Sequence, residues 1–232
     1  RNLDLYLGME NNIVYDINDV LTGVCRIRQA LIKVKAFPGL MFMAASPQKP
    51  TGEITPLHIK VLCSKLKQKY DYILIDSPAG IDDGMIVASG GADMGIVVVT
   101  PEYSSLRNAE IVRQTLEEQG IEKISYVVNK IDLKLIESGK APTFEEITKN
   151  IRDKIVGIIQ KDDNIHVSTN LGVPIVSMTE TYISKSFMAM GMRIKRLLML
   201  IVCAVMTLAW NAQASDEDSI RIEAENYIAS PL

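Results

Sequence analysis

Short apolar runs alternate with helical patterns along most of this 232-residue chain, and this alternation constrains the fold more than any other feature. The runs at 72–76 and 95–100 are apolar at consecutive positions, as expected for parallel strands that helices cover on both faces. We expect strands at residues 40–45, 72–76, 95–100, 125–129, 155–159 and 174–176. The pattern predicts right-handed crossovers and a doubly wound, mostly parallel α/β sheet.

Helical periodicity fills the intervals between these strands. We expect helices at residues 55–69, 81–89, 104–119, 143–149 and 164–171. The clearest is 104–119, where apolar residues recur three or four positions apart and Gly120 follows as a stop signal. Its expected buried face consists of Leu106, Ala109, Val112 and Leu116.

Composition narrows the functional classes. With 47% hydrophobic and 23% charged residues, the chain has the make-up of a globular protein of one α/β domain or two small ones. A net charge of −3 gives no basic field, so we expect no nucleic-acid partner. The three cysteines are widely spaced and odd in number, which favours a reducing compartment over a disulfide framework or a zinc site.

The composition changes abruptly near Met192. Residues 192–196 are basic, 197–210 are apolar, and Ala212-Gln-Ala214 is a small-x-small pattern, so the parts of a secretory signal follow one another in the correct order. We therefore predict one domain at 1–191 and a foreign segment at 192–232, joined from an unrelated reading frame. Two alternatives are a long final helix that docks its apolar face on the domain and an interfacial membrane helix.

Three of the expected strands end in polar residues, and ligands of such sheets bind at the carboxyl ends of the strands. Asp76 follows four apolar or aromatic residues, so its carboxylate can hold magnesium through water. The turn Ser77-Pro-Ala-Gly80 can bring backbone N–H groups close to an oxyanion, because its small residues add little bulk. A strand that simply ends in a helix-capping Asp-Ser pair would have the same sequence.

The second strand end is Val127-Val-Asn129-Lys-Ile-Asp132, and the third is Gly157-Ile-Ile-Gln160-Lys-Asp162. The Asn129 amide can pair with a purine edge, and the Lys130 stem can lie over its face. Asn-Lys-x-Asp is also how guanine-specific hydrolases recognise their base, through the acid. An Asn-Lys turn after a buried strand is the structural alternative.

Taken in order, several segments resemble the septum-site-determining MinD branch of the ParA/MinD family of deviant-Walker P-loop ATPases. The resemblance covers about residues 1–190. It rests on Arg1-Asn-Leu-Asp-Leu5, Val14-Tyr-Asp16, Gln29-Ala-Leu-Ile32, Asp71-Tyr-Ile-Leu-Ile-Asp-Ser-Pro-Ala-Gly-Ile81, Thr100-Pro-Glu-Tyr-Ser-Ser-Leu-Arg107, Val156-Gly-Ile-Ile159 and Asn170-Leu-Gly-Val-Pro-Ile-Val176.

The resemblance implies a role for each strand end. Asp76 would be the Walker B acid that holds Mg²⁺ through water, and Ser77, Pro78, Ala79 and Gly80 would form the second switch. Asn129 and Lys130 would contact the base of ATP, with Gln160 and Asp162 closing its pocket, although the family expects proline at position 160. Four residues would lie on the dimer and partner face: Arg1, Asn2, Ser104 and Arg107.

The resemblance also implies partners and a location. Members of the family form a homodimer on ATP and lie at the inner face of the cell membrane, as peripheral proteins of the cytoplasm. They recruit a division inhibitor, and a topological-specificity protein then triggers ATP hydrolysis.

One family motif does not occur in the sequence. Gly-x-x-x-x-Gly-Lys-Ser/Thr is found nowhere in the chain, so the Walker A lysines are absent. We expect the family's first βαβ unit of about 40 residues to precede Arg1. Its strand would lie beside the Asp76 strand, which would otherwise be an open edge. We therefore predict that these 232 residues neither bind nor hydrolyse ATP measurably.

Two other functions stay open. One is a different ATPase of the same group; an iron–sulfur carrier would need a Cys-x-x-Cys, which the sequence does not contain, and a partitioning protein would need a basic surface. The other is a partner-binding module that works without nucleotide through the face around residues 103–107.

Overall fold

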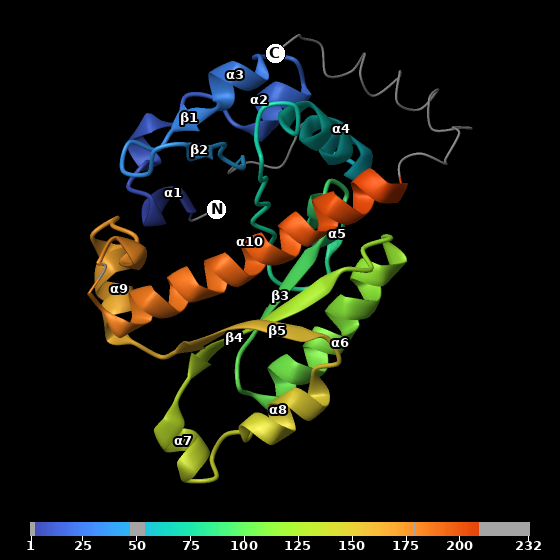
Figure 1. Ribbon diagram of the computed structural model, residues 1–232. Helices are drawn as coiled ribbons and strands as arrows, with labels where there is room; N and C mark the ends of the chain where they lie inside the picture. The colour runs from blue at the N-terminus through green and yellow to red at the C-terminus, as the bar shows by residue number, and fades with distance from the viewer. Residues whose placement is uncertain (1–2, 47–53, 179, 209–232) are drawn as a thin grey trace.

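A three-stranded parallel sheet forms the centre of the computed structural model, which describes residues 3–46, 54–178 and 180–208. Its strands are β3 (Gly95–Val99), β4 (Ile124–Ile131) and β5 (Lys154–Gln160), in the order β3-β4-β5 (Figure 1). Val97 pairs with Tyr126, and Val128 pairs with Ile158, so all three strands point the same way. The strands expected at 95–100, 125–129 and 155–159 are confirmed, and so is the α/β class.

Helices cover both faces of this sheet. On one face, α6 (Tyr103–Glu118) and α8 (Phe144–Asn150) enclose a core with β3 and β4; on the other, α10 (Tyr182–Leu208) crosses β5 (Figure 1). The apolar face expected for α6 is confirmed, because Leu106, Ala109 and Leu116 are buried and Val112 packs beside them. The helices expected at 143–149 and 164–171 correspond to α8 and α9 (Asp163–Asn170).

The contact between α10 and β5 depends on a glycine. A Cβ atom on Gly157 would lie 2.6 Å from Sδ of Met190, closer than a real Cβ atom can stand. Phe187, Ile194 and Leu197 pack with Met190 on the same cluster, whose buried members include Val156 and Ile159. The helix runs without a break across the boundary predicted at 191/192, and Ile194 and Leu197 dock as the final-helix alternative requires. The foreign origin of 192–232 stays a prediction, and 209–232 lie outside the described residues.

The first part of the chain builds its own small cores. It contains α1 (Leu3–Tyr6), η1 (Glu10–Asn12), α2 (Ile17–Leu21), α3 (Ile27–Ala30), β1 (Ile32–Lys33), β2 (Met41–Phe42), α4 (Pro56–Leu66) and α5 (Asp83–Ser89). Asp16 caps α2, accepting hydrogen bonds from the backbone N of Asn18 and of Asp19. The strand expected at 40–45 is only Met41–Phe42, paired antiparallel with β1. The helices expected at 55–69 and 81–89 are confirmed as α4 and α5.

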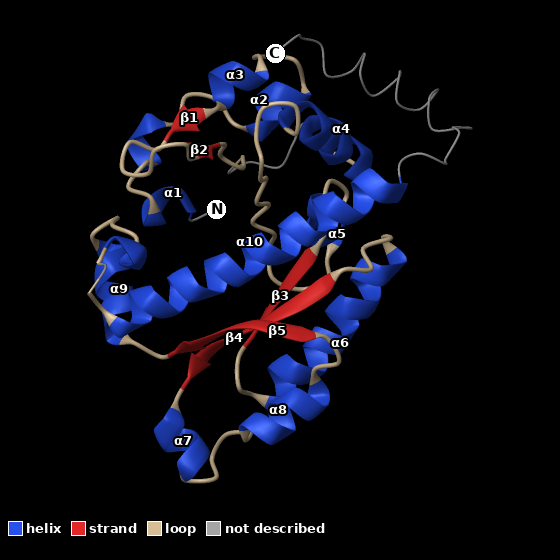
Figure 2. Cartoon of the chain, viewed as in Figure 1, coloured by secondary structure: helices blue, strands red, loops and turns tan. Residues whose placement is uncertain are grey.

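Two expected strands are wrong. Residues 72–76 belong to no strand, and Figure 2 draws this stretch between α4 and α5 as loop. Among the described residues no neighbouring strand pairs with it, and its apolar side chains are mostly exposed: Leu74 is 80% exposed, whereas Ile73 packs against the core that includes α4. Residues 174–176 enter a 3₁₀ turn, η2 (Ile175–Ser177), because Pro174 has no N–H for a ladder and its carbonyl accepts from Ser177 N at 2.9 Å.

In the ranges that the structure describes, no helix is both long enough and apolar enough to span a bilayer.

Candidate functional site

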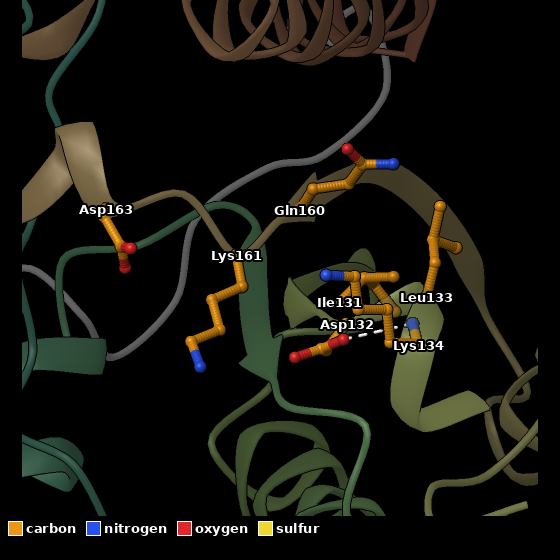
Figure 3. Close-up of a pocket in the computed structure, with 7 residues that line it drawn as sticks. All are labelled: Ile131, Asp132, Leu133, Lys134, Gln160, Lys161 and Asp163. Carbon is orange, nitrogen blue, oxygen red and sulfur yellow. Dashed lines mark hydrogen bonds between the residues drawn. The ribbon is translucent and has the colours of Figure 1, made fainter. Parts of the chain in front are cut away.

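A cavity of about 360 Å³ opens where β4 and β5 end (Figure 3). The last residues of the two strands, Ile131 and Gln160, pair with each other. Directly after them, Lys161 N donates a hydrogen bond to the Ile131 carbonyl at 2.9 Å. This is the edge where an α/β sheet binds ligands. The cavity is lined by Ile131, Asp132, Leu133, Lys134, Gln160, Lys161 and Asp163.

Both strands turn directly into helices that an aspartate caps. Oδ1 of Asp132 accepts from the backbone N of Lys134 at 3.1 Å and of Leu135 at 3.4 Å, which starts α7 (Leu133–Glu137). Oδ1 of Asp162 accepts from Asn164 N at 2.8 Å and starts α9. One oxygen of each carboxylate is therefore engaged with backbone rather than open to a ligand.

Near the end of β4, where the pairing with β5 is irregular between Val128 and Ile131, Asn129 bonds to the neighbouring backbone. Oδ1 of Asn129 accepts from Lys130 N at 2.9 Å, and Lys130 has φ +58°, the one positive φ outside glycine among the described residues. That conformation is uncommon for a side chain with a Cβ atom, and such strain is often found at functional turns. Of the four residues predicted at the base, Gln160 lines the cavity, whereas Asn129, Lys130 and Asp162 are not among its lining residues.

Sequence reasoning missed most of the other lining residues. Leu133 and Lys134 lie in the first turn of α7, and their position depends on the bend that Asp132 stabilises. Lys161 directly follows the last strand residue, and Asp163 begins α9. The sequence signal that could have identified these lining residues was their position just after the ends of two adjacent strands.

Asp76 and the turn after it are exposed to solvent. Within the described part of the chain, the Asp76 carboxylate makes no hydrogen bond, so it can accept one from a magnesium-bound water. Gly80 has φ +100°, a conformation that favours glycine. Pro78 lies over the start of α5, where a Cβ atom on Gly84 would come within 3.1 Å of its Cγ.

The predicted partner face lies at the start of α6. Ser104 and Arg107 are exposed there, and Arg1 and Asn2 lie outside the described residues. The Tyr103 hydroxyl donates to Glu146 at 2.9 Å and joins α6 to α8. This hydrogen bond raises the pKa of Tyr103, and the backbone N–H of Thr143, followed by the Tyr103 hydroxyl, lowers the pKa of Glu146.

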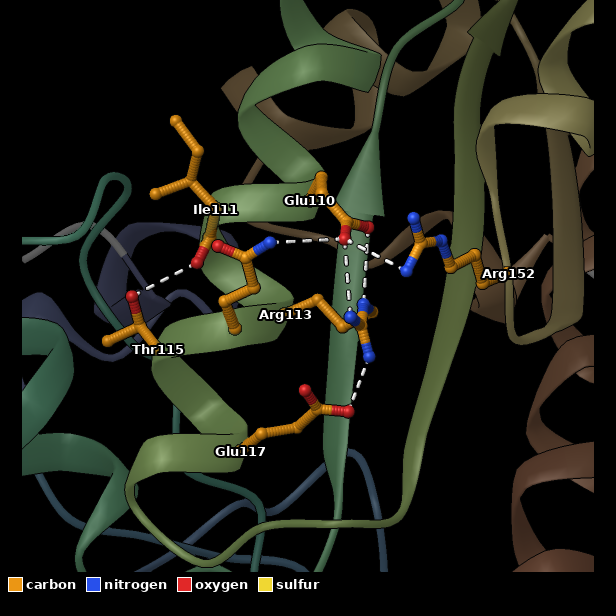
Figure 4. Close-up of polar contacts among 7 residues, drawn as sticks. Glu110, Ile111, Arg113, Thr115, Glu117 and Arg152 are labelled. Carbon is orange, nitrogen blue, oxygen red and sulfur yellow. Dashed lines mark hydrogen bonds and ion pairs between the residues drawn. The ribbon is translucent and has the colours of Figure 1, made fainter.

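A network of ion pairs joins the other end of α6 to the segment before β5 (Figure 4). Glu110 accepts from Arg113 at 3.2 Å and pairs with Arg152 at 3.6 Å, and Arg113 also contacts Glu117. The hydrogen bond from Arg113 lowers the pKa of Glu110. Because Arg152 precedes β5 and Gln160 ends it, this network lies at the edge of the sheet opposite the cavity.

The residues present fit some parts of a magnesium nucleotide better than others. The exposed Asp76 carboxylate could hold a water of a hydrated metal ion, and the cavity at the ends of β4 and β5 is lined mainly by polar and charged side chains. No loop in the sequence matches the phosphate-binding pattern, and the described residues contain no group of three or more His, Cys, Asp or Glu able to hold a metal directly. The chain's own residues therefore do not fit the triphosphate.

Comparisons with known proteins agree on one family, although no protein-family model matches the chain. The septum site-determining protein MinD of Bacillus subtilis is 41% identical over 177 residues, which cover 75% of this chain and 66% of that protein. MinD of Helicobacter pylori is 38% identical over 201 residues, covering 84% and 75%. The chain thus spans about two thirds of the length of the first of these curated relatives.

Solved structures give the same result. The MinC:MinD cell division complex of Aquifex aeolicus superposes with a TM-score of 0.76 at 32% identity, over 93% of this chain and 81% of that one. MinD of Pyrococcus horikoshii complexed with Mg-ADP superposes with a TM-score of 0.74 at 25% identity, over 84% and 79%.

Proposed function

This chain belongs to the MinD family of septum site-determining proteins, and we propose on that premise that it serves in choosing the division site as a MinD-type ATPase. The observation that carries this proposal is a cavity of about 360 Å³ at the carboxyl ends of β4 and β5, the edge where ligands of such sheets bind. The exposed Asp76 turn supports it.

The proposed ligand is ATP with Mg²⁺. A relative of this fold was solved with Mg-ADP, which supports a nucleotide for this chain too. Asp76 would hold a water of the magnesium ion, and the turn from Ser77 to Gly80 would sense the terminal phosphate. Asn129, Lys130, Gln160 and Asp162 would surround the base. Because the sequence contains no phosphate-binding loop, we predict that these 232 residues alone bind ATP too weakly to measure.

The proposed partners are a second copy on ATP, a MinC-type division inhibitor, a topological-specificity protein and the inner membrane surface. The complex of a related protein with MinC supports the inhibitor. Ser104 and Arg107 are exposed and available for it, and Arg1 and Asn2 would join them. The protein would act in the cytoplasm, as a peripheral protein at the membrane.

A nucleotide-independent partner module is the second candidate. It is favoured by the exposed start of α6, which keeps its fold without any phosphate-binding loop in the sequence. A pull-down of the inhibitor with and without ATP separates the two, because only the module binds equally in both conditions.

The decisive experiment is titration calorimetry followed by a hydrolysis assay. We expect no micromolar MgATP binding by the 232-residue chain and clear binding once the first βαβ unit of the Bacillus subtilis relative is fused upstream. In that fusion Asp76→Ala should abolish magnesium-dependent turnover.

Asp82→Ala is the matched control, because Asp82 is an exposed acid nearby that makes no capping hydrogen bond. Turnover that survives Asp76→Ala would show that Asp76 has a different role, and micromolar binding by the unfused chain would contradict the weak-binding prediction.

A further inference from the structure

One residue pair at the start of α5 brings together the two groups from which isoaspartate forms. Asp83-Gly84 is the one Asp-Gly pair among the 232 residues, and the sequence contains no Asn-Gly pair. Isoaspartate arises when a backbone nitrogen attacks the side-chain carbonyl carbon of the aspartate before it. Because glycine has no Cβ atom, it leaves this nitrogen unshielded and the backbone around it free to rotate. Asp-Gly is therefore the aspartyl pair that reacts most readily.

Both reacting groups are accessible in the fold. Asp83 and Gly84 are exposed to solvent, and the Asp83 carboxylate makes no hydrogen bond or ion pair within the described residues. The Gly84 N–H is one of the first donors of α5, which have no acceptor inside the helix. Within the described part of the chain, no backbone carbonyl outside the helix accepts from it either. Neither group must give up a hydrogen bond to react.

The first turn of α5 is held less firmly than the end of the helix. The residue before it, Asp82, makes no side-chain capping hydrogen bond, and the buried Met85 follows the reacting pair. At the other end, a Cβ atom on Gly90 would lie 2.4 Å from the Pro56 carbonyl oxygen, so that end packs tightly on α4. Helix ends without such contacts open locally at low free-energy cost. Opening gives residues 83–84 the backbone rotation that ring closure requires.

We propose that Asp83-Gly84 is a site of spontaneous isoaspartate formation. The Gly84 nitrogen loses its proton and bonds to Cγ of Asp83, while a Cγ–O bond breaks and one water leaves, which closes a succinimide ring. Water then adds to the ring. Cleavage between the nitrogen and Cγ restores aspartate, and cleavage between the nitrogen and the main-chain carbonyl carbon gives isoaspartate. One water leaves and one returns, and nothing is oxidised or reduced.

The modification changes the turn that precedes α5. In isoaspartate the main chain runs through Cβ and Cγ of residue 83 and is one methylene longer. Gly84 lies close to Pro78, since a Cβ atom on Gly84 would come within 3.1 Å of the Pro78 Cγ. The added methylene therefore displaces Pro78 and the turn from Ser77 to Gly80. The loss of phosphate sensing that this implies rests on the proposed function, whereas the chemistry at residue 83 does not.

The test incubates the full chain at neutral pH and physiological temperature. An isoaspartyl methyltransferase with labelled S-adenosylmethionine reports the isoaspartate content at successive times, and electron-transfer fragmentation of the peptides locates the modified residue. We expect the label to increase with time and to map to residue 83. A synthetic peptide of residues 79–88 is the positive control for the chemistry, because it lacks the packing of the folded chain.

Two variants isolate the reacting side chain. Asp83→Glu keeps the negative charge at the start of α5 but must close a six-membered ring, which is much slower, so the label should be lost. Asp82→Glu is the matched control and should leave the label unchanged, because the residue after Asp82 has a Cβ atom. Label that survives Asp83→Glu, or that maps to Asp76 instead, overturns the assignment of this site.

Absence of isoaspartate from the incubated chain also overturns it. If the peptide forms isoaspartate in the same time, the fold of α5 protects the pair. None of these outcomes depends on nucleotide binding, which the calorimetric titration tests separately.

Discussion

Two apolar runs in this chain have similar sequences and different structures. One is Val127-Val-Asn129 in β4, and the other is Ile73-Leu-Ile-Asp76. The first lies between β3 and β5 and is buried, with Val128 only 1% exposed. The second belongs to no strand, and Leu74 is 80% exposed.

The difference shows that an apolar run specifies a strand only where neighbours take up its backbone hydrogen bonds. β4 has a parallel partner on each side. Within the described residues, 72–76 has none, although its side chains have the same preference for a sheet. The two runs also end differently, because Asp132 after β4 caps a helix whereas Asp76 makes no hydrogen bond there.

Hydrogen exchange should show the largest contrast. The amides of Val127 and Val128 are paired in the sheet, and those of Leu74 and Ile75 are not. We expect protection to be at least about a thousandfold higher in β4, because its amides exchange only through large-scale opening. Equal protection of both runs would mean that 72–76 is paired in solution, and fusion of the upstream βαβ unit should protect it.

Truncation of one side chain in each run should give the next largest difference. Val128→Ala removes two buried methyl groups' worth of contact and should lower the free energy of unfolding by about 1.5–3 kcal/mol. Leu74→Ala should change it by less than about 0.5 kcal/mol, because Leu74 is mostly in water. Urea denaturation measures both, and an equal loss would contradict the contrast in burial.

Alkaline pH should lower the stability of the fold through ionisation of Tyr126, which lies in the buried strand β4. Burial, with a smaller contribution from Asp153, raises the pKa of Tyr126 from 10.0 to about 12. The folded state therefore favours the neutral phenol. Burial of the neutral phenol therefore stabilises the folded state fully below pH 10. As pH rises through about 12 the phenol ionises, and the free energy of unfolding falls by about 1–3 kcal/mol. Relative to Tyr126→Phe, the unmodified protein should lose stability over that range; parallel pH profiles would exclude the effect.

Replacing the acid that follows each apolar run, Asp132 or Asp76, should give the smallest difference in the free energy of unfolding. Asp132→Ala removes the cap of α7 and should cost about 0.5–2 kcal/mol. Asp76→Ala should leave the free energy of unfolding unchanged within about 0.5 kcal/mol, because no hydrogen bond of the described residues is lost. A clear cost for Asp76→Ala in thermal unfolding would show that the carboxylate has a structural role.

Local patterns predicted most of the sheet and its helices. The spacing of Leu106, Ala109 and Leu116 was enough for α6, and the valine and isoleucine runs were enough for β3, β4 and β5. The failure at 72–76 came from outside the segment, since its own residues resemble those of β4. The failure at 174–176 came from Pro174, which disfavours a ladder.

The candidate site was predicted by position rather than by residue. Strand ends indicated the correct edge, and Gln160 was among the residues named there. Leu133 and Lys134 were missed because their place depends on a helix that begins within one residue of the strand. The orientation of Asn129 depends on the left-handed backbone of Lys130, which no spacing rule indicates.

Gly157 is the position in β5 where α10 packs too closely to leave room for a side chain. Any substitution there adds at least a methyl group where Sδ and Cγ of Met190 now lie, so the Met190 side chain or α10 itself would have to move. Variation in α10 and at position 157 is therefore coupled: a bulkier residue in the strand would require a smaller side chain opposite. Laboratory evolution that starts from Gly157→Ala should recover compensating changes at position 190 first.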